Sequence, residues 1–249
     1  MSWLEPARPR LLAHRGLAID APENTLLAFL KALALGATYL ETDVHASRDG
    51  VAVIAHDADL VRVAGRDTKI RDLTVSELKQ IDLGAGQTFC TLAEALEAFP
   101  QARFNIDIKS LAAAKPAAQA ILDARAIGRC LIGSFSENRR LAAVRLLPGV
   151  ATSATSYRFA VALLAAKLGL TPLVRAAVHG LDAVQVPERA AGLRIATRRV
   201  IDRLHSVGVE VHMWTINDVA TMKKLLDLGV DGLVTDRIDL ALVLVGQDI

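Results

Sequence analysis

The sequence predicts an α/β protein built as a single (β/α)8 barrel, a TIM barrel. Strand-type runs alternate with helical runs eight times, and no Pro- or Ser-rich linker separates them. The length of 249 residues also fits one such barrel, which takes roughly 250 residues. Length alone would also admit two small domains, and the alternation alone an open doubly wound sheet. Together they favour one barrel domain over residues 1–249.

Eight short runs are expected to form the barrel wall. They cover Arg10–His14, Tyr39–Val44, Arg103–Lys109, Cys130–Phe135, Ala151–Thr155, Ala183–Val186, Glu210–Thr215 and Gly232–Thr235. An additional run, Val51–His56, follows the second strand and leads into a short insertion at about residues 57–90.

Helical patterns fill the segments between these strands. They cover Thr25–Leu35, Val75–Gln80, Leu92–Ala98, Pro116–Ala126, Glu137–Leu147, Tyr157–Leu168, Thr197–Val207, Val219–Leu228 and Leu240–Val245. Thr74 and Thr91 are each followed three residues later by Glu, which is the capping-box pattern of a helix N-terminus.

Composition and charge exclude several classes of protein. With 52% hydrophobic residues the chain is not expected to be disordered. Its 29 basic and 27 acidic residues form no basic stripe, so we expect no nucleic-acid partner. The first ten residues hold no signal-peptide core, and two cysteines make neither a disulfide framework nor a zinc set. We therefore expect a cytoplasmic protein.

The least polar long stretch covers residues 159–174. It is interrupted by Lys167 and Pro172 and is shorter than the ~20 apolar residues that a membrane-spanning helix needs. We expect no transmembrane segment, and a barrel helix here instead. Peripheral contact of this stretch with a membrane stays open.

Polar side chains occupy one face of the third predicted strand. Because side chains alternate along a strand, Asn105, Asp107 and Lys109 share a face, opposite Phe104 and Ile106. The apolar face suits the helices around a barrel, so the polar face points into the lumen. Burying unpaired charge there is costly. A functional site explains these residues, although simple pairing of Asp107 with Lys109 is the structural alternative.

Two carboxylates end the second strand. Glu41 and Asp43 lie on one face, roughly 7 Å apart along the strand. Like charges at this spacing favour a bound cation, and carboxylate oxygens suit Mg²⁺, Ca²⁺ or Mn²⁺. With Asp107 from the next strand, three carboxylates form a candidate metal site.

Two histidines follow strands directly. His14 ends the first strand and His56 ends the additional run, so both are expected at the C-terminal face where barrel enzymes keep catalytic groups. Two histidines can divide the roles of general base and general acid. Arg15 and Lys109 supply positive charge that suits a phosphate group.

Taken together, these residues resemble the glycerophosphodiester phosphodiesterase family of metal-dependent TIM barrels. The motifs follow in family order from residue 11 to 237, with little signature between about 110 and 180. They are Ala13-His14-Arg15-Gly16, Ala21-Pro22-Glu23-Asn24-Thr25, Leu40-Glu41-Thr42-Asp43-Val44, Asp49-Gly50, Val53-Ile54-Ala55-His56-Asp57, Leu73-Thr74, Asn105-Ile106-Asp107-Ile108-Lys109, Val211-His212-Met213-Trp214-Thr215-Ile216-Asn217 and Gly229-Val230-Asp231-Gly232-Leu233-Val234-Thr235-Asp236.

The resemblance implies metal-dependent hydrolysis of a small glycerophosphodiester to glycerol 3-phosphate and an alcohol. It implies these roles: His14 and His56 as the acid–base pair, Glu41 and Asp43 as ligands of a divalent cation (Mg²⁺ or Ca²⁺), Arg15 and Lys109 on the phosphate, and Trp214 as an apolar wall beside the glycerol.

The sequence departs from the family pattern in two places. The family usually carries Glu where Asp107 stands, and the shorter side chain puts direct metal ligation by Asp107 in question. The family also commonly has a longer segment over the site, so residues 57–90 are expected to form a shortened cap.

Three other functions remain open at the level of sequence: a related phospholipase or lyase that releases a cyclic phosphate, a catalytically weak glycerophosphodiester-binding protein, and a structural barrel.

His45 shares a face with Asp43, and His212 shares one with Trp214, so either histidine can approach the lumen. The sequence leaves the head alcohol, the metal and the oligomeric state undetermined.

Overall fold

Eight parallel strands form a nearly closed barrel in the computed structural model, which describes residues 2–5, 7–190 and 193–246. The strands are β1 (Arg10–His14), β2 (Tyr39–Ala46), β6 (Arg103–Ile108), β7 (Cys130–Gly133), β8 (Ala151–Thr152), β9 (Ala183–Pro187), β12 (Glu210–Trp214) and β13 (Gly232–Thr235). They are hydrogen-bonded in the order β8-β7-β6-β2-β1-β13-β12-β9. A parallel bridge from Ser153 to Ala183 joins the two ends. The predicted (β/α)8 barrel is confirmed.

Strand register places the polar side chains at one level. His14 pairs with Glu41, Glu41 with Asn105, and Asp43 with Asp107. Because all these strands run in the same direction, their carboxyl ends meet at one rim. The register therefore gathers residues from widely separated parts of the sequence.

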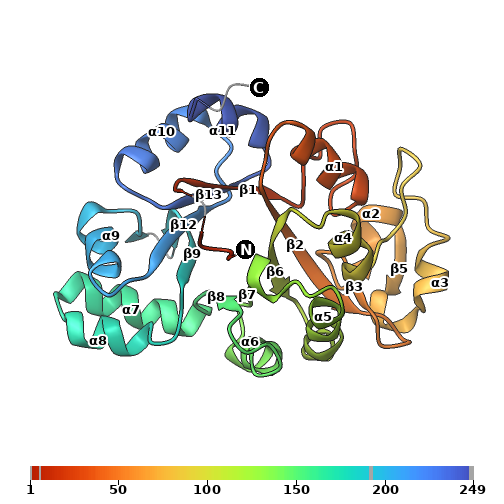
Figure 1. Cartoon of the computed structure of the whole chain (residues 1–249), viewed down its shortest axis with the longest axis horizontal. Helices are drawn as coiled ribbons and strands as arrows, with labels where there is room; N and C mark the ends of the chain where they lie inside the picture. Colours follow the sequence, from red (N-terminus) through yellow and green to blue (C-terminus); the bar gives the residue numbers. More distant parts are fainter. Residues whose placement is uncertain (1, 6, 191–192, 247–249) are drawn as a thin grey trace.

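Helices surround the strands on the outside (Figure 1). They are α1 (Leu26–Ala34), α4 (Leu92–Ala98), α5 (Leu111–Asp123), α6 (Glu137–Val144), α7 (Ser156–Leu168), α8 (Thr171–Ala177), α9 (Arg198–His205), α10 (Val219–Asp227) and α11 (Ile238–Leu244). The capping boxes of Thr74 and Thr91 are both present. Buried Val, Ile, Leu and Ala between strands and helices form the main core.

The insertion after β2 packs as a small unit beside the barrel. It contains β3 (Ala52–Ile54), antiparallel to β2, and then β4 (Asp59–Leu60), α2 (Val61–Ala64), β5 (Arg66–Lys69), a 3-10 turn (Ile70–Asp72) and α3 (Val75–Leu78). Its side chains form a second core, which comprises Val53, Ala55, Leu60, Ile70, Leu78, Ile81 and Phe89.

Several predicted boundaries are wrong. Helix α5 begins at Leu111, five residues before the predicted start, and Pro116 lies inside it. The proline costs one backbone hydrogen bond, and burial of the surrounding alanines against the core offsets this. Helix α8 and the hairpin of β10 (Arg189–Ala190) with β11 (Leu193–Arg194) were not predicted. Strand β8 is two residues long, and Lys109 and Phe135 lie beyond the ends of their strands.

Within the described residues, no helix has the length and apolar character needed to cross a bilayer. Cys90 and Cys130 are free and buried. Burial raises the pKa of each thiol to about 12, so both are uncharged and unreactive at neutral pH.

Candidate active site

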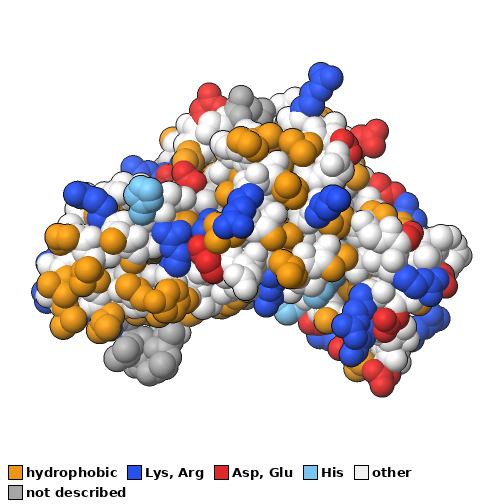
Figure 2. Space-filling view, turned by 90° about the horizontal axis from the view of Figure 1, so that it is seen from below, with side chains coloured by type: hydrophobic (Ala, Val, Ile, Leu, Met, Phe, Trp, Pro, Cys, Tyr) orange, Lys and Arg blue, Asp and Glu red, His pale blue; other side chains and the backbone are white. Residues whose placement is uncertain are grey.

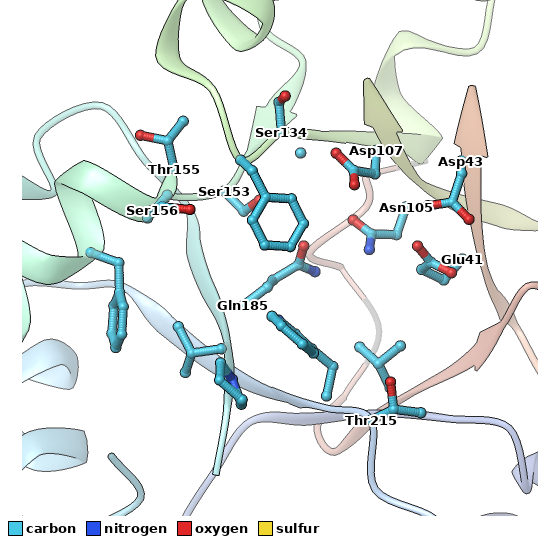
Figure 3. A pocket seen from close by; sticks show the side chains of 18 of the residues that line it. Glu41, Asp43, Asn105, Asp107, Ser134, Ser153, Thr155, Ser156, Gln185 and Thr215 are labelled. Carbon is cyan, nitrogen blue, oxygen red and sulfur yellow. The ribbon is translucent and has the colours of Figure 1, made fainter. Parts of the chain in front are cut away.

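A cavity of about 630 Å³ opens at the carboxyl ends of the barrel strands. All eight residues that the sequence singled out line it: His14, Arg15, Glu41, Asp43, His56, Asp107, Lys109 and Trp214. Figure 3 shows the carboxylates of Glu41, Asp43 and Asp107 together on one wall, with Asn105 between them. A cavity of this size at this end of a TIM barrel is where a small-molecule site is expected.

His14 lies at the end of β1 and is fixed by a carboxylate directly after the last strand, β13. Its Nδ1 is 2.6 Å from Asp236 Oδ1, and Asn217 Nδ2 donates to the other Asp236 oxygen at 2.7 Å. Burial opposes the charged imidazolium, but Asp236 and Glu41 outweigh it and raise the pKa of His14. Because Nδ1 donates to Asp236, Nε2 is the nitrogen available for proton transfer.

His56 also lines the cavity and is held in the same way. Its Nδ1 donates to Asp57 Oδ1 at 2.7 Å, and Arg62 Nε donates to Asp57 Oδ2 at 2.6 Å. Arg62 also reaches Glu23 Oε1 at 2.6 Å, which ties the insertion to the loop after β1. Both histidines thus present Nε2 as the free nitrogen.

The acidic wall is buried, and two of its side-chain oxygens have no hydrogen-bond donor in the described part of the chain. Burial and the nearby Asp43 raise the pKa of Glu41 to about 8, and burial raises the pKa of Asp107. The buried Oδ1 atoms of Asn105 and Asp107 have no hydrogen-bond partner among the described residues. Such orphaned oxygens are costly in a folded protein and are characteristic of ligand sites.

Two cations face this wall. Lys109 Nζ is 2.8 Å from both Asp43 Oδ1 and Asp107 Oδ2, and Arg15 Nε is 3.3 Å from Asp43 Oδ2. Burial disfavours the charged amine, but the two carboxylates raise the pKa of Lys109 above its usual value. Asp107 therefore pairs with Lys109, which is the structural explanation that the sequence left open. This pairing uses only Oδ2 and leaves Asp107 Oδ1 without a hydrogen-bond partner among the described residues.

The donor set has the chemistry of a site for a hard cation. Its candidate ligands, the carboxylates of Glu41, Asp43 and Asp107, offer only oxygen donors, and Asp107 Oδ1 has no hydrogen-bond partner among the described residues. As the side chains stand, no three His, Cys, Asp or Glu residues in the described ranges form a group that could hold a metal ion. Lys109 bridges Asp43 and Asp107 instead.

An apolar wall faces the charged one. Trp214, the last residue of β12, packs edge-on against Phe135 with ring centroids 5.9 Å apart, and Lys109 Nζ lies 5.7 Å from the Phe135 ring centroid. Helix α7 extends this wall with Phe159 and Leu163. The cavity thus combines a polar half with an apolar half, as small-molecule sites usually do.

The two further histidines that the sequence placed near the lumen both lie outside the cavity lining. His45 does not line the cavity: its Nε2 lies 3.2 Å from the backbone oxygen of His56, behind that residue. His212 is fully buried deep in the barrel, beside Glu210 and Trp3, away from the rim. Asp236 and Asp57, which orient the two histidines, were not predicted as site residues. A carboxylate directly after a strand is the signal that marks Asp236.

The fold and the rim define a class of protein, the barrel enzymes that place acid–base and charged groups on the loops after their strands. The sequence model of the glycerophosphoryl diester phosphodiesterase family matches residues 14–240, and the chain belongs to this family. It is accordingly a phosphoric diester hydrolase.

Individual relatives agree with this assignment. A probable glycerophosphodiester phosphodiesterase 2 of Mycobacterium tuberculosis is 42% identical over 92% of this chain and 88% of its own length. The crystal structure of a glycerophosphodiester phosphodiesterase from Thermotoga maritima is 30% identical, with a TM-score of 0.74 over 96% of this chain and 100% of that chain. A phosphodiesterase from Oleispira antarctica, solved in complex with the product sn-glycerol-3-phosphate, is 25% identical, with a TM-score of 0.76 over 96% and 97% of the two chains.

Proposed function

We propose that this chain hydrolyses glycerophosphodiesters to glycerol 3-phosphate and an alcohol, with a divalent cation and with His14 and His56 as the acid–base pair. One observation carries the proposal: two histidines, each fixed through Nδ1 by a carboxylate, line the same cavity as an acidic wall and two cations. The product bound to the Oleispira antarctica relative supports glycerol 3-phosphate as the product here.

The substrate is proposed to span the two walls of the cavity. Its phosphate would lie against Arg15 and Lys109, whose donors suit phosphate oxygens. Its glycerol would pack on Trp214, which Phe135 supports from the side. The orphaned Asn105 Oδ1 is available to accept a hydrogen bond from a hydroxyl group.

Glu41 and Asp43 would hold the Mg²⁺ or Ca²⁺ ion, with Asp107 as a third oxygen donor. When bound, such an ion would stabilise the negative charge that develops on a non-bridging phosphate oxygen. The shorter side chain of Asp107 already engages Lys109 through Oδ2, which leaves Oδ1 as its free donor atom.

The two histidines would move the protons. One Nε2 accepts the proton of the nucleophile as its oxygen forms a bond to phosphorus. The other donates a proton to the leaving alkoxide as the second phosphorus–oxygen bond breaks. If water attacks, glycerol 3-phosphate forms directly. If the glycerol 2-hydroxyl attacks, a cyclic phosphate forms first, and a second round with water opens it while the two histidines exchange roles.

Residues 57–90 are proposed to act as a reduced cap. Arg62 joins Asp57 in this segment to Glu23 in the loop after β1, so the segment positions His56 at the cavity entrance. A small cap suffices here because residues of α7 also line the cavity.

An assay of glycerol 3-phosphate release tests the proposal. We expect release from glycerophosphocholine, glycerophosphoethanolamine or glycerophosphoglycerol in the presence of Mg²⁺ or Ca²⁺, and none after chelation. Phosphorus NMR of the products separates the alternatives. A cyclic ester as the final species would identify a lyase, and binding without turnover under every cation would identify a binding protein.

A further inference from the structure

Helix α7 and the start of α8 carry an exposed apolar patch that the proposed catalysis does not use. Six side chains make up this patch, with 39–76% of their surfaces exposed: Tyr157, Val161, Leu164, Leu168, Leu170 and Leu173. The first four recur at intervals of four, three and four residues, so they form one stripe along α7. In Figure 2 hydrophobic side chains gather at the end of the molecule where Figure 1 places α7 and α8.

The inner side of α7 is apolar as well. Phe159, Ala162, Ala165 and Ala166 are buried against the core. A surface helix normally turns a polar face to solvent, and a helix that is apolar all round is normally covered. A contiguous exposed apolar surface of this kind marks an interaction site.

The helices that carry the patch contain basic residues and no acidic one. Arg158 and Lys167 belong to α7, where Arg158 pairs with Glu137 of α6, and Arg175 belongs to α8. Arg199 and Arg203 of α9 add to these, because their guanidinium groups lie beside Gly169 at the end of α7. An apolar stripe fringed by Lys and Arg complements an anionic lipid surface, which takes up apolar side chains and attracts cations.

The patch also adjoins the cavity. Leu164 belongs to the exposed stripe and lines the cavity, and Lys167 lines the cavity one turn further along α7. Neither hydrogen bond nor ion pair engages Lys167 among the described residues. A surface that binds through this patch would therefore face the entrance of the active site.

We infer that the α7–α8 patch docks the enzyme onto the surface of an anionic lipid bilayer, with the cavity entrance turned toward the lipid. This docking goes beyond the proposed hydrolysis, which uses other residues. The apolar side chains enter the boundary between headgroups and acyl chains, and the basic fringe contacts the lipid phosphates. The inferred partner is the anionic bilayer surface, not a second protein.

Vesicle sedimentation tests the inference. We expect the protein to sediment with vesicles of phosphatidylcholine and phosphatidylglycerol, to bind pure phosphatidylcholine at least tenfold less, and to be released by high salt. A triple variant Tyr157→Ser, Leu168→Ser, Leu173→Ser should lose at least tenfold in binding. These three residues do not line the cavity, so its release of glycerol 3-phosphate from a soluble substrate should be unchanged.

A matched control changes exposed apolar residues on other helices. Leu30 of α1 is 52% exposed and Val243 of α11 is 64% exposed, and the double variant Leu30→Ser, Val243→Ser should bind vesicles like the wild type. Circular dichroism checks that both variants fold. No binding of the wild type, or equal binding of the patch and control variants, overturns the inference. One further result would overturn it. If the patch variant has a different molecular mass from the wild type on size exclusion but binds vesicles equally well, the patch is a self-association surface.

Discussion

The two ends of the barrel both bury charged side chains, and they do so in opposite ways. At the amino-terminal end, Arg10 is 2% exposed and donates to Glu210 through Nε and Nη2, to Tyr39 through Nη1 and to the backbone oxygen of Leu4. His212 also lies 3.1 Å from Glu210. Every nitrogen of the Arg10 guanidinium therefore has an acceptor.

The carboxyl-terminal rim has the reverse balance. Glu41, Asp43 and Asp107 lie close together, and the buried Oδ1 atoms of Asp107 and the neighbouring Asn105 accept no hydrogen bond from the described residues. Burial and the nearby Asp43 raise the pKa of Glu41 to about 8. At the other end the pKa of Glu210 is about 2, because the hydrogen bonds from Arg10 and His212 outweigh the effect of burial. The charges of the amino-terminal cluster are thus matched by partners, whereas the rim holds buried carboxylates whose charged form is disfavoured, as expected of a site that gives up stability for function.

The largest expected effect is on catalysis at the rim. His14→Ala should lower kcat/KM on the order of 10²–10⁴-fold, because it removes one of the two proton-transfer groups. His56→Ala should have an effect of similar size. Both are measured by glycerol 3-phosphate release.

His179→Ala serves as the control, since His179 lies in an exposed loop away from the cavity. Its activity should equal that of the wild type. If His14→Ala kept full activity, the assignment of the rim as the active site would be wrong.

The next effect is on stability at the amino-terminal end. Glu210→Gln should destabilise the fold by about 3 kcal/mol, because Arg10 is left buried without its counter-charge. Urea unfolding at pH 7 measures this. The folded variant should keep its kcat, since the residues that lose a contact, Arg10 and His212, do not line the cavity. Asp227→Asn, in an exposed pair with Lys223, is the control and should cost less than about 1 kcal/mol.

The same pair predicts a dependence on pH. The pKa of Glu210 falls from 4.5 to about 2 on folding, so its stabilisation is fully present above about pH 4.5 and is lost as the pH falls through 2. Arg10, His212, Tyr39 and the nearby Asp182 are the charged or titratable groups facing it. The gap in unfolding free energy between wild type and Glu210→Gln should therefore shrink by about half between pH 7 and pH 3. A gap that stays constant would show that the pair contributes through packing alone.

The sequence predicted the barrel and the rim well, for a physical reason. Alternation along a strand determines which side chains share a face, so the positions of Asn105 and Asp107 in the lumen follow from the amino-acid order alone. Parallel strands then bring such faces to one rim, and the register of β1, β2 and β6 does so. Local rules sufficed where the site consists of residues at strand ends.

Contacts between distant segments could not be predicted in this way. Asp236 orients His14 across 222 positions, and no local pattern links the two. The position of α7 as a wall of the cavity depends on how it packs against α8 and α9. Proline favours the first turn of a helix, so the sequence predicted a helix start at Pro116, but burial of the surrounding alanines extends α5 back to Leu111. Tertiary packing decided each of these.

Cation binding at the rim should stabilise the fold, as the paired charges are expected to do at the amino-terminal end. At about a hundredfold excess over Kd, Mg²⁺ or Ca²⁺ should stabilise the fold by about 2.7 kcal/mol and raise Tm by several degrees. The ion would add positive charge beside the rim carboxylates, beyond that of Lys109 and Arg15. Thermal unfolding with and without chelator measures the shift. Asp43→Asn should abolish most of it, whereas Glu210→Gln should retain it in full; equal shifts in both variants would move the cation site away from Asp43.

The smallest expected effect is a change in stability on removing a rim charge, and its sign should be opposite to that of Glu210→Gln at the amino-terminal end. Asp107→Asn should raise stability by about 1 kcal/mol while lowering activity, because burial raises the pKa of Asp107 and its charge is therefore unfavourable in the folded state at neutral pH. Lys109 keeps Asp43 as its partner in this variant, so no cation is left unpaired. Urea unfolding and kcat/KM are measured together. A loss of stability comparable to that of Glu210→Gln would mean that Asp107 and Lys109 form a structural pair. Asp107 would then resemble Glu210, and its charge would stabilise the fold.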